Sequence, residues 1–468
     1  MAVGPGAPAS TAAPSTTPPP AAPRALGVGV LLASAGLVGS FAAAGVNTVA
    51  VARIEGPHAT GLVALSGQVV IIATLVAGIG LRTSVTYRVG ARLWSPRSAL
   101  HASLRAAIGL GIAGAGVGLG VYALLRHSAM SDFTWPMAAA LMASLPFVLA
   151  WWIVPAVPLA RDRFEQYALL TLSGPAAVLV LCPLGAVFGG SSGTVFGFAA
   201  GYVVGGLITV GWALRFAGRE DARHGPDHGI RAARGFGLRA WVNDLFQFVN
   251  VRPDLFIVSA YYGAAATGVY SITVSITSLV WIASQPLAAV VLPRTASLRG
   301  GDDSEPRLAA AEPHVAAVRH AVLVCALATL ALIPALVIAP VVWGPGFGRI
   351  TQLGLIMAPG VALLGVARVM VAAFTGRGAA NHALAVGFVS FPLTLVAFLL
   401  VIPDHGSTGA AVVSCVSYLA VSALSAVFFF RGTGAGLRAS LVPHEGDLRG
   451  YLELARRLRR QLQRSSVD

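Results

Sequence analysis

The residues best suited to chemistry lie in one short, mostly apolar stretch of the chain. Polar side chains recur there at steps of three or four residues: Arg239, Asn243, Gln247, Asn250 and Asp254. On an α-helix these steps keep the side chains within about 80° of arc, which predicts a single polar stripe on one helix face. Such a stripe cannot face lipid, so it must line a water-filled cavity or pair with another helix.

Two isolated arginines indicate which chemistry this stripe could serve. Arg252 follows the stripe, and Arg368 stands alone in a second apolar block, LLGVARVMVAAF. The sequence also supplies two carboxylates of opposite charge, Asp244 and Asp254, which leaves two readings open. The residues either form a buried ion pair that holds two helices together, or they line a path for an anion. Guanidinium groups bind phosphate oxygens well, so phosphate or pyrophosphate is the natural anion.

The position of Arg252 on its helix is a separate expectation. On an ideal helix it projects away from the stripe, and Pro253 is expected to kink the helix and re-aim it. If Arg239 marks the inner membrane surface, a rise of about 1.5 Å per residue puts Arg252 about 20 Å across, in the outer half of the bilayer.

The composition requires a membrane around these residues. The chain has 468 residues, 56% hydrophobic and 11% charged, and its mean hydropathy is +0.77. Soluble domains hold about 25% charged residues. We therefore expect an all-α, polytopic membrane protein with about twelve transmembrane helices. The apolar blocks fall near 26–50, 62–81, 106–125, 137–160, 166–188, 195–216, 240–262, 264–292, 320–343, 351–376, 382–403 and 407–430.

The arginines set the expected orientation of these spans. With the N-terminus placed inside, 27 arginines fall in inside segments and three (Arg53, Arg126 and Arg349) fall in outside segments. This is the asymmetry of the positive-inside rule, so both termini are expected in the cytoplasm of a cell-membrane protein. The net charge of +14 has the same origin, and nucleic acid is not an expected partner.

The same blocks divide the chain into parts. We expect a disordered Pro/Ala-rich tail (1–23), a six-helix lobe (24–217), a cytoplasmic linker (218–238), a second six-helix lobe (239–431) and a cytoplasmic tail (432–468) with an amphipathic basic helix. The cysteines at 182, 325 and 415 lie in different blocks and are expected to be small core residues.

No motif indicates an enzyme, a metal site or a cofactor. The fingerprint GLGIAG (Gly109–Gly114) and the elbow GGSSG (Gly189–Gly193) occur without the strand that either motif needs. We read the second as an outer hairpin. The continuation of the first places Gly114 with Gly118, and Gly116 with Gly120, at the spacing of close helix packing.

Several short pieces, in order along the chain, carry a resemblance to a known family. They are Ala52-Arg53, Gly56-Pro57 and Gly61; Asp254, Gly263, Gly268-Val269-Tyr270 and Leu292-Pro293; VWGPGF (Val342–Phe347) with APG (Ala358–Gly360); and Pro403 with HGSTGAA. The chain resembles the polysaccharide flippases of the multidrug/oligosaccharidyl-lipid/polysaccharide exporter superfamily, over most of residues 26–430.

The resemblance implies two related six-helix lobes around a central cavity, with alternating access. It implies transport of a lipid-linked saccharide of the polyprenyl-pyrophosphate type to the outer leaflet, with membrane lipids and polysaccharide-synthesis enzymes as partners. In that picture Arg252 and Arg368 hold the pyrophosphate and the amides bind sugar. Asp254 and Asp244 are candidates for ion coupling. A cation-coupled drug antiporter of the same superfamily and a membrane scaffold remain as alternatives.

Overall fold

The computed structural model describes residues 23–78, 80–217, 252–297, 312–376 and 380–434, together with Gly436 and Ser440. Within these residues every regular element is a helix, which confirms the all-α prediction. The helices are α1 (Pro23–Gly78), α2 (Leu81–Gly90), α3 (Pro96–Leu125), α4 (Trp135–Ala143), α5 (Leu145–Ile153), α6 (Ala156–Ala160), α7 (Phe164–Ala217), α9 (Pro253–Ser297), α10 (Glu312–Trp343), α11 (Ile350–Gly376) and α12 (Ala380–Thr433).

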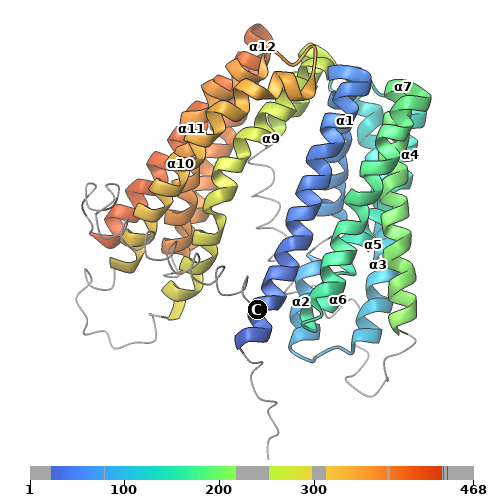
Figure 1. Ribbon diagram of the computed structural model, residues 1–468, viewed down its shortest axis with the longest axis horizontal. Coiled ribbons are helices and arrows are strands. Elements are labelled where there is room, and N and C mark those ends of the chain that lie inside the picture. Colours follow the sequence, from blue (N-terminus) through green and yellow to red (C-terminus); the bar gives the residue numbers. More distant parts are fainter. Residues whose placement is uncertain are drawn as a thin grey trace, which may run out of the picture.

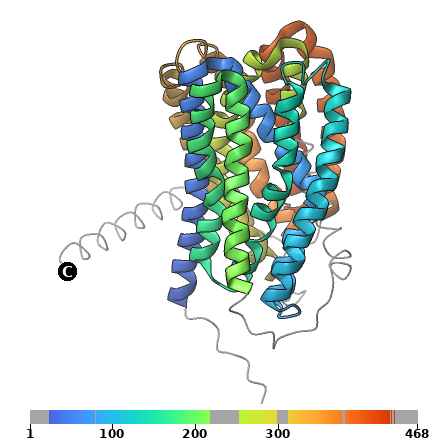
Figure 2. The same cartoon turned by 90° about the vertical axis from the view of Figure 1, so that its right-hand side faces the viewer.

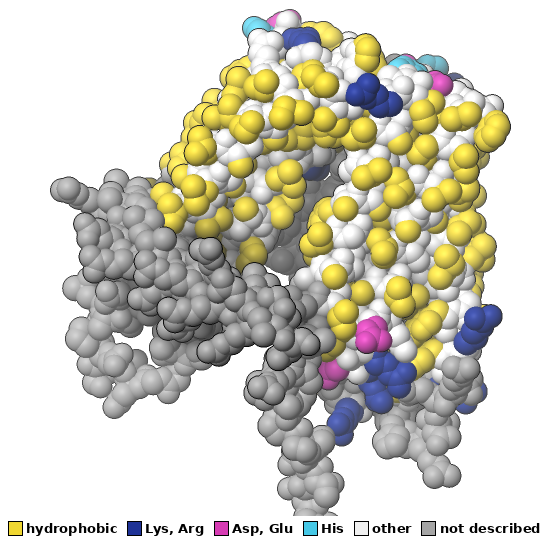
Figure 3. All heavy atoms as spheres, in the orientation of Figure 1, with side chains coloured by type: hydrophobic (Ala, Val, Ile, Leu, Met, Phe, Trp, Pro, Cys, Tyr) yellow, Lys and Arg dark blue, Asp and Glu magenta, His cyan; other side chains and the backbone are white. Residues whose placement is uncertain are grey.

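The helices form two bundles, as the two-lobed prediction requires. Helices α1 to α7 make the first bundle and α9 to α12 make the second (Figure 1). The bundles meet at one end of the molecule, the closed end, and diverge toward the other, the open end, where α1 begins. Turned by 90°, the helices of the first bundle run side by side along the same axis (Figure 2). The surface is hollowed between the two bundles (Figure 3), which agrees with the predicted central cavity.

Four of the long helices reverse direction at a glycine of the closed end. The backbone leaves helical geometry at Gly56 in α1, Gly190 in α7, Gly263 in α9 and Gly406 in α12, with φ values of 76°, 58°, 73° and 57°. Positive φ is costly for residues with a Cβ, so glycine is what allows these tight reversals. The expected outer hairpin at GGSSG is thus one of four bends.

These bends explain how the structure accommodates the predicted spans. Eight helical stretches of the described chain are long and apolar enough to cross a membrane. Each of the four bent helices joins two neighbouring apolar blocks of the sequence. The block at 240–262 is described only from Arg252 onward. The two tails and the linker lie largely outside the described residues, so the predicted domain boundaries stay predictions.

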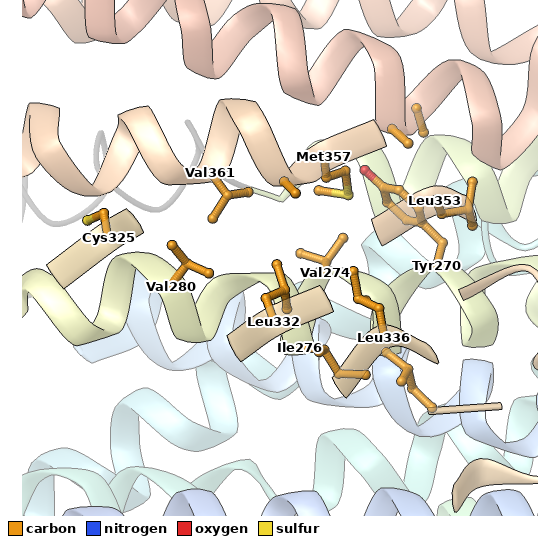
Figure 4. Close-up of a cluster of buried hydrophobic side chains, with 14 of the residues drawn as sticks. Tyr270, Val274, Ile276, Val280, Cys325, Leu332, Leu336, Leu353, Met357 and Val361 are labelled. Carbon is orange, nitrogen blue, oxygen red and sulfur yellow. The ribbon is translucent and has the colours of Figure 1, made fainter. Parts of the chain in front are cut away.

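The outer surfaces and the cores of the bundles are both apolar, as expected for helices in lipid. Outward-facing side chains are largely hydrocarbon: Leu124 and Phe188 are 82% and 86% exposed. The second bundle has one continuous apolar core, part of which runs from Cys325 to Tyr270 in Figure 4. Cys182 and Cys325 are buried, as predicted, whereas Cys415 is only partly buried.

The prediction of close helix packing at the glycines of α3 holds for one of the two pairs. A Cβ on Gly114 would meet Leu145 of α5 at 2.9 Å, and one on Gly118 would overlap the Met142 sulfur of α4. Gly116 and Gly120 have open space around them. The second pair lies on the helix face turned away from the bundle, so only the first pair serves close packing.

Candidate functional site

A buried carboxylate lies in the second bundle, where two parts of α9 and one of α12 meet. Asp254 is 1% exposed, and its Oδ2 accepts a hydrogen bond of 2.7 Å from the Tyr270 hydroxyl. The Tyr270 oxygen lies 3.0 Å from the Ser414 hydroxyl of α12. Oδ1 of Asp254 accepts from the Leu255 amide at 3.0 Å. These donors and the first turn of α9 favour the ionised form of the carboxyl, whereas its burial in an otherwise apolar core favours the neutral form.

Arg252 lies two residues before Asp254, and here one expectation was wrong. We expected a helix that continues through Pro253 with a kink. Instead, Arg252 is outside any helix and Pro253 is the first residue of α9, whose bend comes at Gly263. Proline lacks an N–H and suits the first helical position, which explains the break. Helical geometry therefore does not hold Arg252 away from Asp254, and its charge acts on that carboxylate.

Arg368 of α11 is the second predicted arginine, and it lies against aromatic side chains. Its guanidinium is 4.0 Å from the centre of the Trp281 ring of α9. Its Nε is buried and has no hydrogen-bond partner in the described part of the chain. The half-buried Tyr418 of α12 lies within electrostatic range of Arg368, Arg252 and Asp254. The second bundle therefore holds Arg252 next to the Asp254 carboxylate and Arg368 against Trp281, with Tyr418 in electrostatic range of all three charges.

The two arginines lie at different depths. Arg252 is eleven residues from the bend at Gly263, which corresponds to about 16 Å along the helix. Arg368 is eighteen residues from the start of α11, about 27 Å from the closed end. The other residues of the predicted stripe and Asp244 (Arg239, Asn243, Asp244, Gln247 and Asn250) lie outside the described residues, so their part in the site stays a prediction.

The sequence did not reveal the partners of these charges. Trp281, Tyr418 and Ser414 come from helices that are distant in sequence, and nothing in their spacing marks them. Tyr270 is different, because it belongs to the Gly268-Val269-Tyr270 piece that carried the family resemblance. Its hydrogen bond to Asp254 gives that piece a physical role in the structure.

The closed end is held by contacts between the bundles. Arg53 of α1 donates from Nε to the Val342 carbonyl at 2.8 Å and from Nη2 to the Val341 carbonyl. Both carbonyls belong to the last turn of α10, where free carbonyls attract a cation. A shallow pocket at this point is lined by Arg53 and by the turn after α10, in which Gly344 and Gly346 have φ values of 97° and 92°.

Backbone contacts add to this closure. The Ala264 amide, just after the α9 bend, donates to Oδ2 of Asp132 at 2.6 Å, and Ser259 donates to the Ala129 carbonyl at 2.7 Å. A Cβ on Gly61 of α1 would overlap the Ala264 carbonyl oxygen. The two bundles thus touch backbone to backbone at this end.

Replacing Arg53 by alanine is expected to weaken the closed end. The variant loses both bonds to α10, and because Arg53 is exposed, the shift in population toward separated bundles should be several-fold at most. Spin labels placed on each bundle at the closed end would report it as a longer distance distribution. Arg126→Ala is the control, since within the described residues that exposed arginine has one recorded interaction, with Trp135 of its own bundle. An unchanged distribution in Arg53→Ala would show that the bond carries no closing energy.

Comparisons with known proteins agree on the fold. No protein-family model and no curated protein matches the sequence. Among solved structures, an inward-facing multidrug resistance MATE family transporter of the MOP superfamily aligns with a TM-score of 0.64 at 14% identity, over 84% of this chain and 94% of the other. The lipid II flippase MurJ, in an inward closed conformation, aligns at 0.62 and 10% identity, over 88% and 89%.

A third structure extends the comparison to another transporter. It is a MOP superfamily transporter from Pyrococcus furiosus, described as having a binding pocket of reverse polarity. It aligns at 0.51 and 14% identity, over 88% of this chain and 96% of the other. Identities this low show the shared fold alone, and the fold is shared over almost the full length of each transporter. The chain is a multi-pass membrane protein with the fold of the MOP-superfamily transporters.

Proposed function

We propose that this protein is an alternating-access flippase that moves a lipid-linked saccharide of the polyprenyl-pyrophosphate type from the inner to the outer leaflet. The lipid would remain in the bilayer while the head group crosses through the hollow between the bundles. The arginine distribution supports an orientation with the open end in the cytoplasm. The state described here would then be inward-facing.

The observation that carries the proposal is the environment of Arg368. This guanidinium lies within a membrane span, and among the described residues its Nε is buried without a hydrogen-bond partner and its contacts are aromatic. A half-buried guanidinium with unused hydrogen-bond donors costs free energy in a membrane unless an anion binds to it. Arg252 adds a second positive charge, and Asp254 neutralises only one of the two. The net positive site favours a phosphate-bearing substrate.

The Asp254 cluster supports ion or proton coupling in the same cycle. The carboxylate sits where α9 and α12 meet, so its occupancy by a proton or cation would alter contacts within the second bundle. Asp254→Asn is expected to lower gradient-driven transport by about tenfold or more while leaving substrate binding nearly unchanged. Tyr270→Phe, which removes one hydrogen bond, should cost less. Gradient-driven uptake in Asp254→Asn equal to wild type would exclude this role.

A cation-coupled multidrug antiporter is the second candidate. The buried carboxylate of Asp254 favours it, since a carboxylate can bind a cation, and the MATE neighbours support it at the level of fold. The two candidates differ in the charge of the substrate. Arg252 and Arg368 would repel an organic cation at close range, and an anionic lipid head group would be attracted.

The decisive experiment uses purified protein in liposomes loaded with a fluorescent lipid-linked oligosaccharide. Access of a membrane-impermeant reagent to the sugar is measured on each leaflet, with and without sodium and proton gradients. A cationic dye is tested in parallel vesicles. Transport of the oligosaccharide supports the flippase, transport of the dye alone supports the antiporter, and transport of neither by folded protein favours the scaffold reading.

A further inference from the structure

A second arginine–aromatic cluster lies in the first bundle, and the arginine count alone did not single it out. Arg82, at the start of α2, has its guanidinium 4.1 Å from the centre of the Trp152 ring of α5. Its Nη2 donates to the Tyr167 hydroxyl of α7 at 3.2 Å. Three helices thus converge on one half-buried guanidinium.

The charge of Arg82 is not neutralised by its contacts. These contacts in the described residues are an aromatic face and a phenol, and no carboxylate is among them. Burial lowers the pKa of the guanidinium from its ordinary value, and the neighbouring Tyr167 opposes part of that effect. An arginine nevertheless stays protonated at neutral pH. Because the Tyr167 oxygen accepts from Arg82, its own proton remains available for an anion.

The same three residue types form the cluster around Arg368 in the second bundle. There the guanidinium lies over Trp281, with Tyr418 in electrostatic range. The two clusters also use the corresponding second and fourth spans of each bundle, but the arginine and the tryptophan have exchanged places. In the first bundle the arginine follows the second predicted span and the tryptophan lies in the fourth. In the second bundle the tryptophan lies in the second span of the lobe and the arginine in the fourth.

The backbones of the three arginines lie at different depths. The second part of α1 runs 22 residues from the Gly56 bend to Gly78, about 33 Å, and Arg82 lies just beyond its end. The corresponding values are about 27 Å for Arg368 and about 16 Å for Arg252. Counted along their helices, the backbones of Arg252, Arg368 and Arg82 therefore lie at increasing distances from the closed end.

We propose that Arg82, Trp152 and Tyr167 form a separate binding site for the phosphate or pyrophosphate group of a lipid, at the open end of the first bundle. The Arg82 donors and the Tyr167 hydroxyl bind the phosphoryl oxygens, and the Trp152 ring fixes the plane of the guanidinium. The site receives the head group before it moves to Arg368. The inference rests on the proposed flippase function and adds to it a first point of contact.

The test is equilibrium binding to purified protein in nanodiscs, with three probes: farnesyl pyrophosphate, inorganic pyrophosphate, and phosphatidylglycerol added to an uncharged bilayer. Arg82→Gln is expected to weaken farnesyl pyrophosphate binding about tenfold, since one charge-assisted contact is lost. Arg105→Gln is the matched control, because that exposed arginine has one recorded hydrogen bond within the described part of the chain, to the His101 carbonyl of its own helix. Tyr167→Phe keeps the packing and is expected to weaken farnesyl pyrophosphate binding about threefold. This variant tests the site if Arg82→Gln fails to fold.

The three probes separate the sources of the phosphate. If Arg82→Gln weakens the binding of farnesyl pyrophosphate alone, the site is assigned to the transported lipid. If it weakens the binding of phosphatidylglycerol equally, the site is assigned to anionic lipids in general. A loss for inorganic pyrophosphate as well shows that the phosphate group is sufficient. Unchanged binding of all three probes by both Arg82→Gln and Tyr167→Phe would overturn the site. If wild-type protein bound no probe, the proposed function itself would fail.

Discussion

Replacing Arg252 and Arg368 together by alanine is expected to abolish transport of an anionic lipid-linked substrate. A hydrogen bond to a charged group contributes about 1.5–3 kcal/mol, so each arginine is worth roughly 10- to 100-fold in binding. Loss of both should lower flipping by at least about two orders of magnitude. The liposome assay described above measures it, with each single variant alongside.

The single variants also test whether the arginines act on substrate or on the fold. Arg368 contacts aromatic groups, so Arg368→Ala removes the partner of no carboxylate in the described chain. Arg252→Ala, in contrast, removes a charge that acts on the buried Asp254 and should destabilise the protein. Adding Asp254→Asn to Arg252→Ala should restore thermal stability without restoring transport. If the double arginine variant transports at the wild-type rate, neither residue lies on the substrate path.

The architecture was predictable because membrane physics acts on long stretches of sequence. Blocks of hydrocarbon side chains and the arginines between them determine where helices cross, and the described parts of these blocks are largely helical. Arg368 could also be predicted as a functional residue, since a single charge in an apolar block is expensive. Its Trp281 partner could not, because only the packing of α9 against α11 brings them together.

Local geometry was harder to predict than architecture. The helical wheel placed Arg252 away from Asp254 on the assumption of a continuous helix, and the helix in fact begins at Pro253. For Arg82 the sequence offered a different explanation. It was one of many arginines that the positive-inside rule already accounted for, and its contacts with Trp152 and Tyr167 come from α5 and α7. An arginine whose position the positive-inside rule explains can still take part in a specific site.

A second large effect is expected from Gly61→Ala at the closed end. Here α1 and α9 cross in backbone contact: a Cβ on Gly61 would overlap the Ala264 carbonyl oxygen, and a Cβ on Gly268 would overlap the Pro57 carbonyl oxygen. The atoms in the way are main-chain atoms, which cannot rotate aside as a flexible side chain can. One methyl group must therefore push the two bundles apart at this end. Both glycines belong to the pieces that carried the family resemblance, and this contact explains why a larger residue does not fit.

Overpacking of this kind costs about 1–3 kcal/mol, which corresponds to roughly a 5- to 150-fold change in a conformational equilibrium. In alternating access, the closed end must close while the open end admits substrate. Gly61→Ala should therefore leave the protein folded, raise the reactivity of a cysteine introduced at the closed end by about tenfold, and slow transport to a similar extent. Gly45→Ala is the matched control, since that glycine of α1 has open space around it. If Gly61→Ala and Gly45→Ala gave the same labelling and transport rates, the backbone contact would not limit closure, and Arg53 with Asp132 would have to supply it.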